Sequence, residues 1–220
     1  MARVTLDTNI LSAGYHRHFR AKDPLTQTMK LLVATSNPAK LKDYKDFAKD
    51  LSLEIVSLKD AGVTEEFDEV HNTFEQNAKG KAEFYQRLTN LPTIADDSGI
   101  EIPFYNNEPG VNTKHWDGKG GNDEHYLNFI VDKIKKIPSE QRQAHLVVVL
   151  AYADGKQTVT AEGIIKGVLT DKIYQKITYE YPWDAVFFLP ELNKYNEEVK
   201  QDINWNHRKW AFDKLKKYFV

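Results

Sequence analysis

Two adjacent carboxylates, Asp96 and Asp97, follow an apolar run at residues 91–95. The pattern predicts a strand over 92–95 that ends at these acids, and α/β proteins commonly build their sites at the ends of strands. Neighbouring side chains of an extended chain point to opposite faces, so one carboxylate can face a cleft while the backbone or a basic partner holds the other. Gly99 allows a close approach of the backbone. The alternative is a simple turn, because Asp-Asp-Ser-Gly is also favourable turn chemistry.

The stretch TSNPAK at residues 35–40 has the chemistry of an anion-binding helix start. An apolar segment precedes it, and its proline lies where a helix would begin. Free backbone N–H groups at a helix start attract anions, and nearby side chains can donate as well. The alternative is ordinary N-capping beside a solvated lysine. The candidate phosphate ligands are Thr35, Ser36, Asn37 and, one turn into the helix, Lys40.

The segment EEFDEVHNTFEQNAKGKA at residues 65–82 gathers four acids before a second predicted helix. Carboxylate oxygens together with substrate phosphates are the ligands that Mg²⁺ prefers, so this run is a candidate metal site. Lys81, two turns into the helix, can face the same place. The alternative is a solvated acidic loop, which the helix dipole alone would favour. The four acids are Glu65, Glu66, Asp68 and Glu69.

Two stretches near the C-terminus, YEYPWDAVFF and WNHRKWA, combine aromatic and polar side chains that can bind a nucleobase. The aromatic rings offer flat faces, an aspartate offers an acceptor, and a His-Arg pair offers donors to a base carbonyl or a phosphate. The alternatives are core aromatic residues and a basic pair on the surface. The candidates are Tyr181, Trp183, Asp184, His207 and Arg208.

The elements that must position these residues are strands and helices in alternation, followed by a hairpin. Apolar runs predict the strands, and apolar residues at helical spacing predict the helices. Thr73 with Gln76 fits a capping box, and Asp154-Gly155 signals a hairpin turn. This mixture indicates an α/β or α+β protein with a mixed sheet. The predicted strands are 30–35, 53–58, 92–95, 144–153, 157–165 and 185–190. The helices begin at Pro38, Thr73, Asp123 and Trp205, and a long loop covers 104–122.

Composition excludes several classes of protein. The 220 residues are 41% hydrophobic, with 30 basic and 32 acidic side chains and a formal net charge of -2. This balance argues against a nucleic-acid polymer as partner. The chain has no cysteine, which removes disulfides and thiolate metal sites. No apolar run reaches a membrane span or the core of a signal peptide, so we expect no membrane partner and a cytoplasmic location.

The first 28 residues differ from the rest, with one short apolar stretch and a basic, polar tail. LDTNIL, which contains Asp7, resembles the opening of PIN-type nucleases, but the further acids of that family cannot be placed here. We therefore expect an N-terminal extension of unknown role over 1–28 and one catalytic domain over 29–220. A nuclease built around Asp7 is the alternative.

Taken together and in order, these stretches resemble the inosine-triphosphate pyrophosphatase family, also called the Ham1-like family. The match begins near residue 30 and extends to the C-terminus. ADDSG followed by PGV at the spacing of that family is its strongest part. The six matching stretches are TSNPAK, DEVHNTFEQNAKGKA, ADDSGIEI, EPGV, YPWDAVFF and NHRKWA.

The resemblance implies an α/β fold with a mixed twisted sheet, flanking helices and two lobes around a central groove. It also implies a homodimer that hydrolyses ITP, dITP and XTP to the monophosphate and pyrophosphate with Mg²⁺. Asp97 would be the general base and a metal ligand, with Asp68 or Glu69 as a second ligand. Lys81 would assist the phosphate ligands of TSNPAK, and Ser98 would contact the substrate. The base pocket would comprise Tyr181, Trp183, Asp184, His207 and Arg208.

The match is weaker around the base than around the phosphates. EYPWDA stands where the family has GFGYDP, and the family lysine five residues before the histidine falls on Asp202, with Lys200 nearby. Asn206 replaces the usual serine before the histidine. Pyrophosphate release is therefore the firmer expectation and the preference for inosine or xanthosine the weaker one. The alternative is a nucleotide-binding protein of this fold with altered base specificity or lost catalysis.

Overall fold

The computed structural model describes residues 28–120, 124–174, 181–200 and 202–219. Its framework is an eight-stranded mixed sheet in the order β2-β1-β3-β5-β6-β7-β8, with β4 also paired to β3. β1 is parallel to β2 and β3, and the remaining pairs are antiparallel. The strands are β1 (Met29–Val33), β2 (Leu53–Ser57), β3 (Thr93–Ile102), β4 (Glu108–Gly110), β5 (Gln143–Ala153), β6 (Thr158–Leu169), β7 (Phe187–Leu189) and β8 (Lys194–Tyr195).

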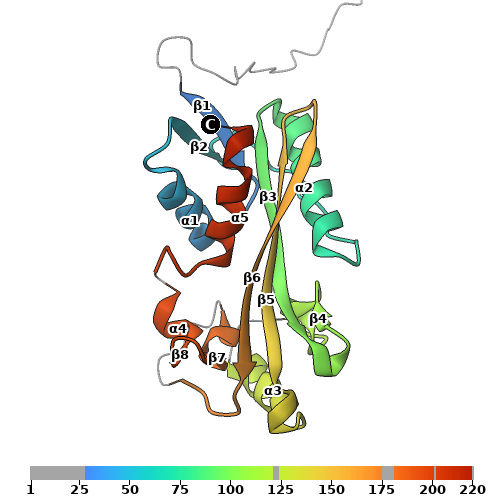
Figure 1. Cartoon of the computed structure of the whole chain (residues 1–220). Coiled ribbons are helices and arrows are strands. Elements are labelled where there is room, and N and C mark those ends of the chain that lie inside the picture. Colours follow the sequence, from blue (N-terminus) through green and yellow to red (C-terminus); the bar gives the residue numbers. More distant parts are fainter. Residues whose placement is uncertain (1–27, 121–123, 175–180, 201, 220) are drawn as a thin grey trace, which may run out of the picture.

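Helices cover both faces of the sheet at one end of the molecule (Figure 1). α1 and α5 share one apolar cluster with β1, β3 and β5, and α2 forms a second cluster on the opposite face. Apolar residues at helical spacing produce both contacts, as the sequence predicts. The α-helices are α1 (Pro38–Ala48), α2 (Phe74–Thr89), α3 (Glu124–Ile134), α4 (Asn196–Val199) and α5 (His207–Leu215).

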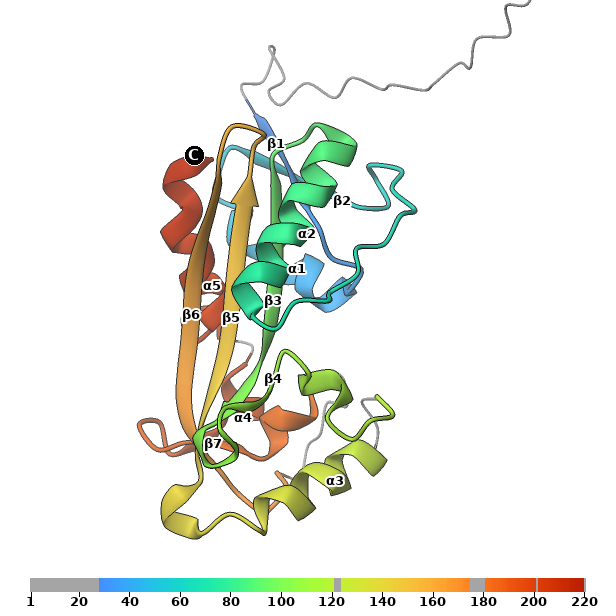
Figure 2. The same cartoon turned by 90° about the vertical axis from the view of Figure 1, so that its right-hand side faces the viewer.

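The long strands β3, β5 and β6 continue into a second lobe, which contains α3, α4, β4 and β7 (Figure 2). A third apolar cluster fills this lobe and includes Ile100 of β3, Leu146 of β5 and Ile130 of α3. The mixed sheet, its flanking helices and the two lobes confirm the predicted fold class. Because β3 belongs to both lobes, its middle lies at the junction between them.

Local chemistry explains where the elements begin. Asn37 caps α1 by accepting hydrogen bonds from the backbone N–H groups of Ala39 and Lys40, at 2.8 and 3.3 Å. Thr73 caps α2 by accepting from the N–H of Gln76 at 3.2 Å, as the capping-box pattern predicts. The predicted hairpin joins β5 to β6.

The prediction that a strand ends at the two acids is wrong. β3 continues through them to Ile102, and Asp96 and Asp97 pair with Leu150 and Val149 of β5. The turn interpretation fails for the same reason. The long apolar strand β5 supplies backbone partners along the whole of β3, so the polar residues remain extended.

The close approach expected at Gly99 is present, but another part of the chain makes it. A side chain there would collide with the hydroxyl of Thr113 and the carbonyl of Gly110. The Thr113 hydroxyl accepts from the N–H of Ile100 at 2.9 Å and donates to the Gly110 carbonyl at 2.6 Å. The predicted long loop at 104–122 therefore includes β4 and short helical turns that pack on β3.

Some predictions lie outside the described residues: the helix cap at Asp123 and the nuclease-like acid Asp7. The division into an extension over 1–28 and a domain over 29–220 stays a prediction. Within the described part of the chain, none of the helices is both long and apolar enough to cross a membrane.

Candidate active site

The two acids point to opposite faces of β3, as extended geometry requires. Asp96 lies on the side of α1 and α5, and its neighbour Asp97 lies on the side of α2. Both are buried, with 2% and 7% of their surface exposed. Ser98, two residues after Asp96, shares its face and lies 3.4 Å from the ammonium of Lys40. The two carboxylates consequently have different partners and different acidities.

Asp96 is the centre of a buried ionic network. Its Oδ2 lies 2.8 Å from Nζ of Lys40 and 3.3 Å from Nε of Arg208, whose Nη1 also lies 2.9 Å from Asp43. Burial alone would raise the pKa of Asp96, but the charges of Lys40, Arg208 and Lys81 outweigh it and hold that pKa well below its usual value. Asp96 is therefore a permanent anion that cannot act as a base near neutral pH.

Asp97 has the opposite character. Its Oδ2 accepts a hydrogen bond from Nδ2 of Asn77 at 2.9 Å, and its Oδ1 accepts from the N–H of Ser98 at 2.8 Å. Burial raises the pKa of Asp97 to about 6, and the charge of Glu69 acts in the same direction against the Asn77 hydrogen bond and Lys81. A carboxylate of this acidity is ionised at neutral pH yet basic enough to take a proton from water.

The acidic segment is placed unevenly around this carboxylate. Glu69 forms an ion pair with Lys81, whose Nζ also donates to the carbonyl of Asp96 at 3.2 Å. The charge of Glu69 also raises the pKa of Asp97. Asp68 is exposed. Of the two alternatives that the sequence leaves open, the geometry favours Glu69 as the second acid of the site.

The donor set fits a magnesium ion held partly by substrate. Among the described residues, no group of three histidine or acidic side chains is arranged to hold a metal. Mg²⁺, however, is usually bound by one or two carboxylates together with phosphate oxygens and water. Asp97 and Glu69 offer such a pair, and Lys81 beside them is a charge that a phosphate can share. These two acids are the residues that would hold the ion.

The start of α1 lies beside the same group of residues. Oδ1 of Asn37 is occupied by the helix cap, while its Nδ2 donates to the hydroxyl of Tyr181 at 3.4 Å. The hydroxyl of Thr35 accepts from the N–H of Asn37 at 3.2 Å. Lys40 joins this helix start to β3, and Ser36 is exposed. The tertiary structure thus connects TSNPAK with both ADDSG and the C-terminal aromatic stretch.

The predicted base-binding residues come from two parts of the chain, residues 181–184 and the start of α5. Trp183 is only 5% exposed and packs against Trp116 in the second lobe, with ring centroids 6.0 Å apart. This is the core position that the sequence left open as its alternative. Asp184 is buried and accepts from Nδ2 of Asn196 at 2.8 Å, with Nζ of Lys200 at 3.9 Å. Burial raises the pKa of Asp184 to about 6.

Lys200 is the lysine nearest in the sequence to Asp202, on which the family lysine would fall. Its Nζ pairs with Glu197 at 2.7 Å and lies 6.0 Å from the centroid of the Tyr181 ring. This cation therefore lies beside Asp184 and Tyr181. The helical turn of α4 brings it there, because residues 197 and 200 are three apart.

The start of α5 supplies the last two predicted residues. His207 is half-buried, and burial together with the charge of Arg208 lowers its pKa to about 3, so the ring is neutral. Arg208 is buried in the Asp96 network, which excludes the surface alternative for this residue. Gly163 of β6 allows the start of α5 to lie close to the sheet, because a side chain at residue 163 would collide with the carbonyl of His207.

Sequence reasoning missed three supporting residues, Asp43, Asn77 and Asn196, each of which makes a polar contact described above. One signal was available for Asn77. It lies at helical spacing from Phe74 and among alanines on the apolar face of α2, and a polar residue on such a face is informative.

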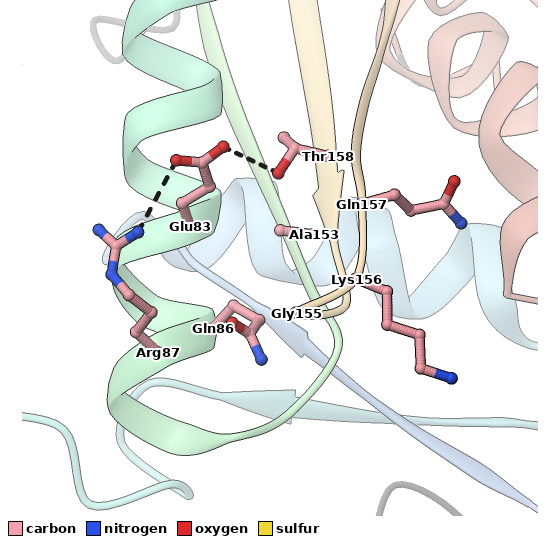
Figure 3. A pocket seen from close by; sticks show the side chains of 8 residues that line it. All are labelled: Glu83, Gln86, Arg87, Ala153, Gly155, Lys156, Gln157 and Thr158. Atoms are coloured by element: carbon pink, nitrogen blue, oxygen red, sulfur yellow. Dashed lines mark hydrogen bonds and ion pairs between the residues drawn. The ribbon is translucent and has the colours of Figure 1, made fainter.

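A cavity of about 300 Å³ lies elsewhere, between the later turns of α2 and the turn that joins β5 to β6 (Figure 3). Its polar contacts are internal: Glu83 accepts from the hydroxyl of Thr158 at 2.8 Å and lies 3.8 Å from Arg87. None of the predicted site residues lines it. The cavity is lined by Glu83, Gln86, Arg87, Ala153, Gly155, Lys156, Gln157 and Thr158.

Comparison with known proteins identifies the family of the chain. A family model described as Ham1 family matches residues 31–218. The chain belongs to the Ham1 family.

The chain matches its relatives in the Ham1 family over nearly their whole length. The chain is 35% identical to a dITP/XTP pyrophosphatase of Staphylococcus epidermidis over 193 residues, 86% of this chain and 95% of that protein. It is 31% identical to a dITP/XTP pyrophosphatase of Caldanaerobacter subterraneus over 195 residues, with 87% and 96% covered. The solved structure of the Staphylococcus aureus Ham1 protein matches with a TM-score of 0.75 at 25% identity, covering 86% of this chain and 97% of that one.

Proposed function

We propose that this Ham1 family protein hydrolyses purine nucleoside triphosphates with non-standard bases, namely ITP, dITP and XTP. The products are the nucleoside monophosphate and pyrophosphate, so the enzyme would clear such nucleotides from the pool. The observation that carries the proposal is Asp97, a buried carboxylate with a pKa of about 6 beside Lys81 and Glu69. The relatives named dITP/XTP pyrophosphatase support the choice of substrate.

In this proposal Asp97 takes a proton from the attacking water. Its two hydrogen bonds, from Asn77 and from the N–H of Ser98, keep the carboxylate oriented. Lys40 and Lys81, together with the positive end of the α1 helix dipole, bind the phosphates and stabilise charge on the leaving pyrophosphate. Bound Mg²⁺ would offset the charge of the triphosphate and make the coordinated water more acidic.

Recognition of the base would rest on Tyr181, Lys200 and His207. A neutral His207 and the ammonium of Lys200 are donors that suit the O6 oxygen of a 6-oxo purine. Adenine carries an amino group at that position and would leave such donors unpaired in a desolvated site. Each unpaired donor costs about 1–3 kcal/mol, which would favour hypoxanthine and xanthine over adenine.

Three further parts of the proposal concern the metal ion, the oligomeric state and the location of the protein. Mg²⁺ is proposed as the metal because Asp97 and Glu69 are oxygen donors. A homodimer is proposed from the resemblance to the pyrophosphatase family, and the cytoplasm is proposed as the location of an enzyme that clears the nucleotide pool. Light scattering coupled to gel filtration tests the dimer, and a mass of one chain at micromolar concentration would refute it.

The decisive experiment is a nucleotide panel. Pyrophosphate release is measured with ITP, dITP, XTP and the four standard ribonucleoside triphosphates, each with Mg²⁺ and with a chelator. We expect rapid release from the first three with Mg²⁺, slow release from ATP, and none with the chelator. A full-length enzyme that binds ITP but releases no pyrophosphate from any nucleotide would instead support the second candidate, a binding protein whose EYPWDA loop has altered catalysis.

A further control addresses the N-terminal segment. Deleting residues 1–28 should leave pyrophosphate release intact, because all the proposed ligands lie later in the chain. A nuclease activity lost on the same deletion would favour a role for Asp7.

A further inference from the structure

Asn77 lies where three parts of the protein meet: α2, the middle of β3 and the acidic segment. Its side chain is almost fully buried, with 2% of the residue exposed. Residues of this polarity are rarely buried unless their donors and acceptors are satisfied. The partners of this amide therefore indicate why it is there.

The amide of Asn77 has a partner at each of its polar atoms. Nδ2 donates to Oδ2 of Asp97 at 2.9 Å and to the carbonyl of His71 at 3.2 Å, while Oδ1 accepts from the N–H of His71 at 3.0 Å. Two donors and an acceptor on one short side chain are what asparagine provides. One residue thus ties the carboxylate of Asp97 to the backbone beside the acidic segment.

The acidic segment is docked on α2 at a second place as well. The hydroxyl of Tyr85 donates to the carbonyl of Glu65 at 3.2 Å. The ring of Phe67 lies against Gly80, where an added Cβ would be 2.7 Å from it, and 5.8 Å from the ring of Phe84. Glu69 lies between these contacts and the His71 contact, so both ends of its loop are held.

We propose that Asn77 is a positioning residue that fixes Asp97 and the acidic loop 65–71 in one arrangement. The inference rests on the proposed function, since it takes Asp97 as the base and Glu69 as its companion acid. Small misplacements of a reacting group can cost about 10²-fold in rate. Without the amide of Asn77, both the carboxylate of Asp97 and the loop that carries Glu69 would lose hydrogen bonds that hold them in place.

The test compares two replacements of Asn77 with a structural control. Asn77→Leu has similar size and removes every polar contact. Asn77→Asp keeps an oxygen for the N–H of His71 but removes both donated bonds and places a second acid against Asp97. The control is Thr93→Val, which removes a fully buried hydrogen bond of 2.9 Å elsewhere on β3, from the hydroxyl to the carbonyl of Leu91.

Two measurements are made on each full-length protein. Steady-state pyrophosphate release from ITP gives kcat and KM, and hydrogen exchange of the free enzyme reports the backbone of 65–71. For Asn77→Leu we expect kcat to fall about 10²-fold, KM to stay within about threefold, and exchange to accelerate in this loop. Asn77→Asp should lose as much kcat with a smaller change in exchange. Thr93→Val should leave kcat and loop exchange at wild-type values.

Asp97→Asn separates failure of this inference from failure of the proposed function. If Asp97→Asn keeps wild-type turnover, the base assignment itself is wrong. If Asp97→Asn is inactive while both Asn77 variants keep wild-type kcat and loop protection, the positioning role is refuted. If Asn77→Leu loses protection throughout the chain, Asn77→Asp decides: normal kcat in a folded Asn77→Asp protein would also refute the role.

Discussion

Replacing Asp97 by asparagine tests the central assignment in two independent ways. The first is kinetic. A general base contributes about 10²–10⁴-fold to rate, so kcat for pyrophosphate release from ITP should fall by at least about 10²-fold. Near-normal turnover by a folded Asp97→Asn protein would refute the assignment.

The second test uses the pH dependence of stability. Folding raises the pKa of Asp97 from 3.8 to about 6, chiefly through burial. The folded protein thus binds this proton more tightly than the unfolded chain does. The stabilisation from this proton is fully present below pH 3.8 and is lost as pH rises through about 6. At about 1.4 kcal/mol per pKa unit, the loss is about 3 kcal/mol. Asparagine cannot ionise, so the Asp97→Asn variant does not show this loss of stability as pH rises.

The assay is urea unfolding of both proteins at pH 4 and pH 8, without metal. At pH 4 a small part of the stabilisation has already been lost, because the unfolded chain titrates near 3.8. The free energy of unfolding of Asp97→Asn relative to wild type should therefore rise by about 2–3 kcal/mol from pH 4 to pH 8. Any constant cost from altered hydrogen bonds to Asn77 and Ser98 cancels in this comparison. Parallel pH curves would show that Asp97 ionises in the folded protein as it does in the unfolded chain, and the reasoning would fail.

Three other predictions follow from the surrounding contacts. Glu69→Ala should raise the Mg²⁺ concentration for half-maximal activity by roughly tenfold, because oxygen ligands set Mg²⁺ affinity, whereas Asp68→Ala should change it by less than about twofold. If neither variant responds in a magnesium titration, the acidic loop is not part of the metal site. Arg208→Met should cost about 3 kcal/mol in urea unfolding, because Asp43 loses its cation while Asp96 keeps only Lys40 as a directly paired cation; a cost below about 1 kcal/mol would contradict the network. Gly163→Ala should cost about 1–3 kcal/mol, because its Cβ meets a backbone carbonyl at the start of α5, and an unchanged thermal midpoint would show that α5 yields freely.

The order and type of most elements could be predicted from the sequence. Apolar spacing identifies α1, α2 and the β5–β6 hairpin, and Asn37 and Thr73 cap the predicted helices. These features are local, because they depend on residues within a few positions of each other. The six stretches that resemble the pyrophosphatase family were identified in the same way, because a match of residue types and order requires no structure.

The length of β3 could not be predicted, and neither could the partners of its acids. Asp-Asp-Ser-Gly reads locally as the end of a strand, and only pairing with β5 keeps it extended through Asp97. Trp183 carries the same sequence signal whether it lines a base pocket or packs on Trp116 in the core. Burial against distant neighbours decides between those outcomes.

Residue types and their spacing along the chain are enough to predict which side chains can bind phosphate, hold a cation and take a proton. The different roles proposed for Asp96 and Asp97 follow from contacts that only the folded chain makes. Asp96 became a fixed anion because Lys40 and Arg208, 56 and 112 residues away along the chain, meet it on one face of the sheet. Asp97 became a candidate base because the other face offers burial, an amide and a second acid. Acidity depends on surrounding charge and solvent, and only the folded chain brings those surroundings together.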